Sequence, residues 1–274
     1  MQDPTLVIGG TGKTGRRVAA RLEAHGRPVR VGSRSGQPPF DWEDRATWEP
    51  ALHGATAAYV SYYPNVAAPG AREAVGELGE LAVASGTQRL VLLSGRGEEE
   101  AQLAEEALQA SGAEWTIVRC SWFMQNFSEG YLLDPVRSGE VALPVGDVPE
   151  PFVDAEDIAD VAVAALTEDG HVGEIYELTG PRSLTFAQAT EEIARACGRP
   201  VSFVPVPIDA YATAAAADGV PADVVALLGY LFTEVLDGRN IDPADGVQRA
   251  LSREPRDFRD FARQAVSSGV WSAA

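Results

Sequence analysis

Lysine is almost absent from this chain of 274 residues, because Lys13 is the only one. Arginine brings the basic residues to 22 against 40 acidic residues, for a formal net charge of −18. A chain this acidic repels a phosphate backbone and an anionic lipid surface, and no local cluster of basic residues offsets the repulsion. The composition therefore argues against nucleic acid and membranes as binding partners.

Cysteine and long apolar stretches are also scarce. Cys120 and Cys197 form no spacing typical of a metal or redox site, so we expect two reduced thiols. The longest stretch without a charged residue, 50–71, contains a histidine, an asparagine and internal prolines, which excludes a membrane span. A strand pattern already begins at Leu6 and leaves no room for a signal peptide. The sequence predicts a cytoplasmic protein.

Over the first 120 residues, short apolar runs alternate regularly with helical patterns. This alternation is typical of a parallel sheet with helices on both faces. The run Glu98-Glu99-Glu100 suits the positive end of a helix dipole. We expect strands near residues 6–8, 28–35, 56–64, 89–97 and 114–119, and helices over 16–25, 71–84 and 98–110.

The pattern changes after Cys120. Residues 121–147 are aromatic and irregular, as expected of a segment that covers a pocket, and a later strand over 174–178 is expected to return to the main sheet. We predict an α/β chain with a doubly wound parallel-sheet Rossmann domain over 1–120, completed by 174–178. A smaller, mostly helical substrate-side lobe is predicted over 121–274.

A glycine-rich loop, Gly9-x-x-Gly12-x-x-Gly15, follows the first predicted strand and precedes the first helix. This spacing is typical of dinucleotide sites: the first glycine permits a tight turn, the second lets the backbone approach a pyrophosphate, and the third lets the helix pack closely. The tripeptide GKT also ends a triphosphate-binding motif, but that motif requires glycine where this chain has Val7. The loop therefore predicts a bound dinucleotide.

The end of the second predicted strand indicates which dinucleotide binds. A chain that binds NAD places an acid there for the ribose 2′-hydroxyl, whereas this sequence reads Ser33-Arg34-Ser35. Arg34 is suited to stack on adenine and to form charge-assisted bonds to a 2′-phosphate, helped by a serine hydroxyl. The alternative is an arginine in a solvated surface loop. We expect NADP(H) as the cofactor.

Seven segments together resemble the NmrA-like branch of atypical short-chain dehydrogenases: GGTGKTGRRV, VGSRS, FDWED, LLSGRGE, WTIVRCSWFMQNFSE, PFVDAEDIADVAVAAL and YELTGPRSLTF. Within that branch the chain is most similar to actinobacterial relatives of fungal ergot-alkaloid iminium reductases, and more distantly to type-2 quinone reductases. The resemblance covers nearly the whole chain. It implies that the cofactor is lined by Gly9, Gly12, Lys13, Thr14, Gly15, Arg34, Ser61, Tyr62, Ser94, Ser121 and the two residues after it.

The chain departs from the wider dehydrogenase pattern in proton transfer. Typical short-chain dehydrogenases pair a tyrosine with a lysine four residues later, which lowers the tyrosine pKa so that it can protonate the product alkoxide. That pair is impossible here, because Lys13 lies in the glycine loop. Where related reductases place a lysine or a histidine, the helix offers Gln102, which transfers no proton at neutral pH. If hydride transfer occurs, either the substrate needs little acid catalysis or another residue donates the proton. An iminium or a quinone meets the first condition, because charge is neutralised or delocalised as hydride arrives.

Two functions remain open at this stage. The first is an NADPH-dependent reductase of a small electrophilic cyclic or aromatic compound of the iminium or quinone type. The second is a non-catalytic NADP(H) sensor that regulates a partner protein, as some NmrA-like members do. A small-molecule substrate is the partner expected in the first case, and the sequence leaves a homodimer open.

Three residues at predicted strand ends are candidates for catalysis. Tyr62 and Tyr63 end one strand, where each either flanks the nicotinamide or donates a proton, or simply packs with its hydroxyl at the surface. Ser94 ends the next strand and either faces the substrate or satisfies local backbone. The substrate pocket is expected to be walled by Tyr63, Trp122, Phe123, Asn126 and Phe127.

The remaining polar clusters predict no metal site. Asp154 and Asp157 precede an apolar helix, where they are more simply a helix cap with an acid in the first turn, and no histidine joins them. The three histidines lie beside glycines, at turns or helix ends, and are expected at the surface: His25, His53 and His171.

Overall fold

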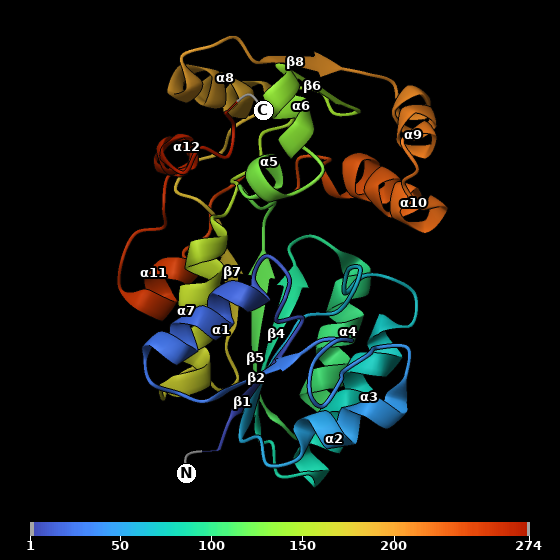
Figure 1. The fold of residues 1–274 in the computed structure, drawn as a ribbon, viewed down its shortest axis with the longest axis vertical. Helices are drawn as coiled ribbons and strands as arrows, with labels where there is room; N and C mark the ends of the chain where they lie inside the picture. Colours follow the sequence, from blue (N-terminus) through green and yellow to red (C-terminus); the bar gives the residue numbers. More distant parts are fainter. Residues whose placement is uncertain (1–2, 273–274) are drawn as a thin grey trace. The chain divides into compact units, whose positions relative to one another are not determined.

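The computed structural model describes residues 3–272 of the chain and divides it into two compact units (Figure 1). Unit 1 contains the residues up to Cys120 together with Ala155–Leu178 and Asp245–Arg253. Unit 2 contains Ser121–Asp154, Thr179–Ala244 and the residues from Glu254 onward. The chain therefore leaves unit 1 and returns to it twice.

Unit 1 is built on a six-stranded sheet in the order β2-β1-β3-β4-β5-β7, and every pairing is parallel. The step from β1 to β3 reverses the direction in which strands are added, which confirms the predicted doubly wound fold. The expected return of a late strand is also observed, because β7 pairs with β5. The strands are β1 (Thr5–Ile8), β2 (Val29–Gly32), β3 (Ala57–Val60), β4 (Arg89–Gly95), β5 (Glu114–Cys120) and β7 (Ile175–Leu178).

Helices cover both faces of this sheet, as Figure 1 shows. On one face lie α1 (Gly15–Ala24), α7 (Ala155–Thr167) and α11 (Gly246–Leu251). On the other lie α3 (Ala71–Ala84) and α4 (Glu99–Ala110), with the short α2 (Trp48–Leu52) and the 3₁₀ turn η1 (Arg45–Thr47) beside them. Apolar side chains of the strands pack against this second layer and form a core that includes Leu6, Ile8, Val75, Leu78, Leu90 and Leu92.

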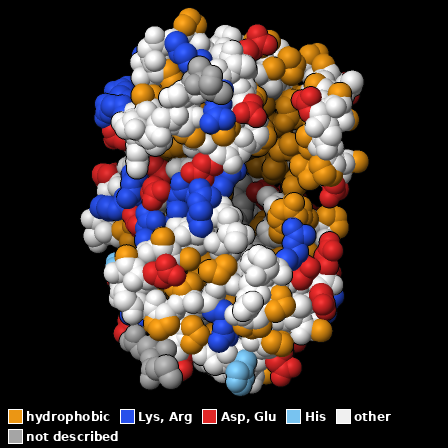
Figure 2. Space-filling model, viewed as in Figure 1, with side chains coloured by type: hydrophobic (Ala, Val, Ile, Leu, Met, Phe, Trp, Pro, Cys, Tyr) orange, Lys and Arg blue, Asp and Glu red, His pale blue; other side chains and the backbone are white. Residues whose placement is uncertain are grey.

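The sequence placed the helix now seen as α7 in the second lobe, whereas the structure places it in unit 1. Its apolar residues are buried on all sides, and its acids face arginines of the same unit. Glu156 pairs with Arg17 at 2.6 Å and with Arg21 at 2.5 Å, while Arg253 reaches the fully buried Asp157 at 2.7 Å. Figure 2 shows acidic and basic side chains interleaved on this face of the molecule. These contacts are long-range in sequence, so local periodicity could not predict them.

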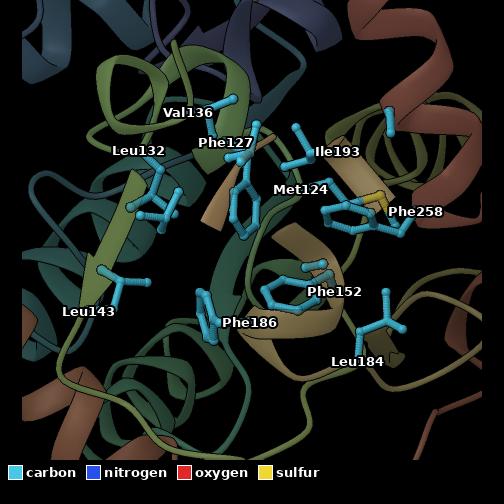
Figure 3. Close-up of a cluster of buried hydrophobic side chains, with 14 of the residues drawn as sticks. Met124, Phe127, Leu132, Val136, Leu143, Phe152, Leu184, Phe186, Ile193 and Phe258 are labelled. Carbon is cyan, nitrogen blue, oxygen red and sulfur yellow. The ribbon is translucent and has the colours of Figure 1, made fainter. Parts of the chain in front are cut away.

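Unit 2 holds a second, strongly aromatic core (Figure 3). Phe152 lies at its centre, with ring centroids 5.0 Å from Phe186 and 5.8 Å from Phe127. Thr185 and Gln188 form a capping box at the start of the helix over 186–197. The elements are α5 (Asn126–Glu129), α6 (Leu133–Ser138), β6 (Glu140–Leu143), α8 (Phe186–Cys197), β8 (Ser202–Pro205), α9 (Ile208–Ala217), α10 (Ala222–Tyr230), the π-helical η2 (Leu231–Val235) and α12 (Phe258–Ser267).

The sequence did not predict β6, which pairs in parallel with β8. Its four residues alternate exposed and buried, so the apolar pattern is too short to distinguish from an irregular segment. Within residues 3–272 no helix is long and apolar enough to cross a membrane.

Candidate functional site

The glycine loop has the geometry that its spacing predicts. Gly9 follows β1 with a φ of +73°, which glycine adopts at no steric cost, and its N–H donates to the Gly32 carbonyl at 3.0 Å. A β-carbon built on Gly15 would lie 2.2 Å from the Gly9 carbonyl oxygen, so only glycine lets α1 begin so close to the strand. The first and third glycines therefore shape the loop itself.

Gly12 differs, because the surrounding chain does not require glycine there. Gly12 is exposed, and a β-carbon would meet only the Gly9 carbonyl oxygen among the described residues, at 3.2 Å. The sequence missed Gly10, where a β-carbon would lie 2.9 Å from both Val31 and the Val7 carbonyl oxygen. An open backbone at the start of a helix, held by tightly packed glycines on either side, suits a phosphate that approaches from outside.

Tyr59 of β3 and Ser61 of the turn after it contact the glycine loop. The hydroxyl of Tyr59 donates to the Thr14 hydroxyl oxygen at 2.9 Å, and both side chains are buried. Burial raises the pKa of Tyr59 far above its ordinary value, so it stays protonated and keeps donating. The Ser61 side chain lies against Gly9, 3.1 Å from the position of a β-carbon on that residue. The structure thus brings Thr14 and Ser61 together with the loop, and it assigns Tyr59 a role that the sequence did not predict.

The segment after β2 presents an exposed cation. The Ser33 carbonyl accepts hydrogen bonds from Gly36 and Phe40, both at 2.9 Å, which folds the segment back on itself. Ser33 and Ser35 place their hydroxyl oxygens 3.4 Å apart. Between them Arg34 is exposed and forms no ion pair with any described residue. A dinucleotide held by the glycine loop fits this arrangement, because an unpaired guanidinium and two hydroxyls suit an anion at the end of β2.

The two candidate tyrosines have different environments. Tyr62 is half-buried against Trp42, with ring centroids 4.7 Å apart, and burial raises the pKa of its hydroxyl. The Trp42 indole N–H donates to the Ser61 carbonyl at 3.1 Å, so the "FDWED" segment packs directly behind this turn. Tyr63 is 74% exposed. Tyr62 therefore lies in the wall of the turn, and Tyr63 projects into solvent.

The structure contradicts Ser94 as a catalytic or cofactor-binding residue. Ser94 is buried, and its hydroxyl donates to Glu105 of α4 at 2.5 Å. Arg119 of β5 binds the same carboxylate through two nitrogens, at 2.9 and 2.6 Å. In β4 Ser94 faces the α4 side of the sheet, so its hydroxyl completes a buried ion pair. The strand-end position alone could not show which face the side chain takes.

Glu98 is buried, which the sequence did not predict. The sequence indicated only that the run Glu98-Glu99-Glu100 suits a helix start, and Glu98 is 6% exposed and caps no backbone N–H of α4. Its carboxyl folds back over Gly95, where a β-carbon would lie 1.8 Å from Oε1. Burial raises the pKa of Glu98 to about 7, although a hydrogen bond from Asn65 opposes the change. The sequence signal that was available for this burial is Gly95, because a residue without a side chain three positions earlier leaves room for the Glu98 carboxyl.

In unit 2 the aromatic segment after β5 is only partly what the sequence predicted. Phe127 is fully buried among Phe152, Phe186 and Phe258, so it belongs to the core and walls no pocket. The prediction failed because α5 turns that face inward. Trp122 is half-buried against the same cluster.

The other residues of this segment that were predicted to line the pocket or the cofactor are either half-buried or have a polar atom without a hydrogen-bond partner. Phe123 and Asn126 are half-buried. The Ser121 hydroxyl oxygen is buried and has no hydrogen-bond partner within residues 3–272. A buried hydroxyl without a partner is costly, which makes Ser121 available to a ligand.

Of the three histidines expected at the surface, His171 is buried. Its Nδ1 lies 2.9 Å from the Tyr176 hydroxyl, and its carbonyl accepts from Thr116 at 2.7 Å. These contacts tie the turn before β7 to the sheet and give the ring a structural role. No group of three or more acidic, histidine or cysteine side chains within residues 3–272 is arranged to hold a metal ion.

Comparison with known proteins agrees with this geometry. A family model for NAD(P)H-binding proteins matches residues 9–169, and a model for the NmrA-like family matches residues 101–262. The oxidoreductase YesF of Bacillus subtilis is 32% identical over 99% of this chain and 98% of its own. Festuclavine synthase II of Penicillium roqueforti is 30% identical over 97% of this chain and 99% of its own.

A solved structure shows the same fold. The NADPH-dependent quinone oxidoreductase of Escherichia coli, complexed with NADPH, superposes with a TM-score of 0.76 over 96% of this chain and 99% of its own, at 20% identity. The family matches span both units, and the match to the NAD(P)H-binding model includes the glycine loop. The chain therefore belongs to the NmrA-like family and is an NAD(P)H-dependent oxidoreductase.

Proposed function

We propose that this protein is an NADPH-dependent reductase of a small electrophilic cyclic or aromatic compound of the iminium or quinone type. Arg34 carries the choice of cofactor, because it is an exposed cation without an ion-pair partner among residues 3–272, directly after β2. An acid at that place would repel a 2′-phosphate, and the segment 33–35 holds none.

The residues that hold the cofactor in this proposal all lie in unit 1. The backbone from Gly9 to Gly15 receives the pyrophosphate, with the ammonium of Lys13 as a partly solvated helper. The Tyr59–Thr14 hydrogen bond keeps the loop in place before the cofactor arrives. Arg34, flanked by Ser33 and Ser35, takes the 2′-phosphate. The bound cofactor supplies the hydride.

The choice of substrate class follows from what the chain lacks. No lysine is available to lower the pKa of a tyrosine, and burial raises the pKa of Tyr62. A simple ketone would become an alkoxide and need a strong acid, whereas an iminium carbon becomes a neutral amine without any proton. Similarity to a festuclavine synthase and the shared fold of a quinone oxidoreductase support this class.

The experiment follows the hydride itself. NADPH deuterated on one face of the nicotinamide at a time would be incubated with the protein and three probes: N-methyl-dihydroisoquinolinium, menadione and acetophenone. We expect the iminium product to carry deuterium from one labelled face only, measurable turnover of menadione, and little turnover of acetophenone. Tight NADPH binding without turnover of any probe would instead support the sensor that regulates a partner protein.

A further inference from the structure

The carboxyl ends of β3, β4 and β5 enclose one acid that the proposed function has not used. In the parallel register Tyr59 lies beside Val91, so Gly95, four residues on, faces the same side of the sheet as Tyr59. Gly95 in turn lies beside Cys120. Glu98 folds over Gly95, and its carboxyl therefore occupies the side of the sheet to which the Tyr59–Thr14 hydrogen bond attaches the glycine loop.

One carboxyl oxygen of Glu98 has no hydrogen-bond partner within residues 3–272. The Asn65 side-chain oxygen accepts the Ala67 N–H at 2.6 Å, so its amide N–H₂ is the end that faces Glu98. The second oxygen, Oε2, is buried and has no partner within residues 3–272. A protonated carboxyl with a buried, unused O–H is the form that this environment favours.

Within residues 3–272, the groups that interact with Glu98 are the Asn65 amide and the Cys120 thiol, and neither carries a positive charge. Cys120 of β5 is the titratable neighbour, and Tyr59 of β3 lies next to that thiol. Burial raises the pKa of both groups well above their ordinary values, so both are neutral at pH 7. Burial also raises the pKa of Glu98 to about 7. The carboxyl is thus the acid of this edge that exchanges its proton near neutral pH.

We propose that Glu98 is the proton donor for quinones, whose hydride adduct is a delocalised, weakly basic hydroquinone anion rather than a strongly basic alkoxide. Ligands of open α/β sheets bind outside the carboxyl ends of the strands, which is where this acid lies. The inference rests on the proposed function and deepens it, because it lets the site accept quinones as well as iminium ions.

The step balances as follows for a quinone. The quinone accepts a hydride, which is one proton with two electrons, and becomes the hydroquinone anion while NADPH becomes NADP⁺. The O–H bond of Glu98 breaks, a new O–H bond forms on the anion, and Glu98 is left as a carboxylate. Solvent returns one proton to Glu98 before the next turnover. An N-alkylated iminium needs only the hydride.

Two probes separate this role from a structural one. Glu98→Gln should lower kcat/KM for menadione by roughly 100-fold and leave N-methyl-dihydroisoquinolinium nearly unchanged. For wild-type protein, menadione turnover should fall as the pH rises above about 7 while iminium turnover does not, in line with the pKa of Glu98. Glu99→Gln, which removes an exposed acid from the same helix turn, is the matched control and should behave as wild type.

A readout without turnover tests the acid itself. Infrared difference spectra between wild type and Glu98→Gln should show the C=O stretch of one protonated carboxyl at pH 6, which disappears as the pH rises through 7. Gly95→Ala, whose β-carbon would displace Oε1, should shift that titration.

Four results would overturn the inference. Equal losses for both probes in Glu98→Gln, or menadione turnover that does not change, would exclude Glu98 as donor. A carboxyl that is already ionised at pH 6 would do the same. Wild type that reduces neither probe would overturn the proposed function, and the donor role with it, even where the carboxyl titrates near pH 7.

Discussion

The carboxyl edge of the unit 1 sheet has two halves that are built in opposite ways. At β1 and β2 the chain presents open backbone at Gly12 and the unpaired cation Arg34. At β4 and β5 it encloses acids instead. The first half is arranged for an anion that comes from outside. In the second half the ionisable groups are buried side chains of the protein itself. Substitutions there are therefore expected to change the stability of the fold and its dependence on pH.

Within the second half, two buried glutamates show how environment separates roles. Glu98 and Glu105 are about two helical turns apart. Glu105 is 1% exposed, and Arg119 and Ser94 both donate hydrogen bonds to its carboxylate. Glu98 has one amide partner and an unfilled oxygen, so it keeps its proton to near neutral pH. The two buried carboxyls thus differ in their partners: Glu105 is bound by a cation and a hydroxyl, whereas Glu98 has one oxygen without a partner within residues 3–272.

The largest expected effect is on cofactor binding. Gly12→Val should abolish NADPH binding, because a side chain would fill the space that the pyrophosphate needs, while thermal unfolding stays near that of wild type. Lys13→Ala should weaken binding less than tenfold. Calorimetric titration measures both. A Gly12→Val protein that binds normally, or a Lys13→Ala protein that loses a clear ATP hydrolysis present in wild type, would show that the loop holds another ligand.

The next effect is on stability. Arg119→Met should lower the free energy of unfolding by about 3–5 kcal/mol, because it leaves the buried Glu105 carboxylate without its partner. Arg263→Met, which breaks an exposed pair with Asp260, is the control and should change stability far less. Urea denaturation followed by circular dichroism gives both values. A small loss in Arg119→Met would mean that Glu105 is not held as an ion.

The third effect appears only as pH changes. Glu98 has an ordinary pKa of 4.5 and a folded pKa of about 7, so between these values the unfolded chain releases a proton that the folded chain keeps. Its contribution is complete below pH 4.5 and is lost as the pH rises through 7, about 3 kcal/mol in all. Glu98→Gln should lack this decline. Denaturation curves from pH 5 to 8 that fall equally for both proteins would contradict the assignment.

The smallest effect concerns the choice between cofactors. Arg34→Asp should narrow or invert the preference for NADPH over NADH by roughly 10- to 100-fold, because charge-assisted bonds to the 2′-phosphate are lost. Arg72→Asp makes the same charge change at an exposed position on α3 and should leave the preference unaltered. Equal affinity of wild type for both cofactors would reject NADPH as the preferred one.

The sequence predicted the parts of this molecule that depend on neighbouring residues. The helix expected over 71–84 is observed as Ala71–Ala84, and the glycine loop follows β1 directly, because periodicity and turn residues are local signals. Ser94 and Phe127 could be placed on an element but not on a face, since the partners that decide the face come from other segments. His171 was misplaced for the same reason.

The burial of Glu98 was not predicted for a different reason. Three consecutive glutamates predict the start of a helix, where the dipole favours them, and Glu99 and Glu100 are exposed there. The first is buried because Gly95 leaves room for its carboxyl, a relation that depends on the direction in which the chain leaves β4. Local propensity was correct for the helix and wrong for the side chain, as is common where a site departs from the preferences of its own sequence.

The return of the chain to unit 1 has a consequence for its synthesis. When the first 120 residues have left the ribosome, β5 is an edge strand with its outer hydrogen-bonding groups unpaired, and β7 arrives only at Ile175–Leu178. Asp157 of α7 remains without Arg253 until nearly the whole chain has been made. The nascent N-terminal portion is thus a template for pairing with another strand. The time that the chain spends at intermediate lengths sets its exposure to aggregation and its need for a chaperone.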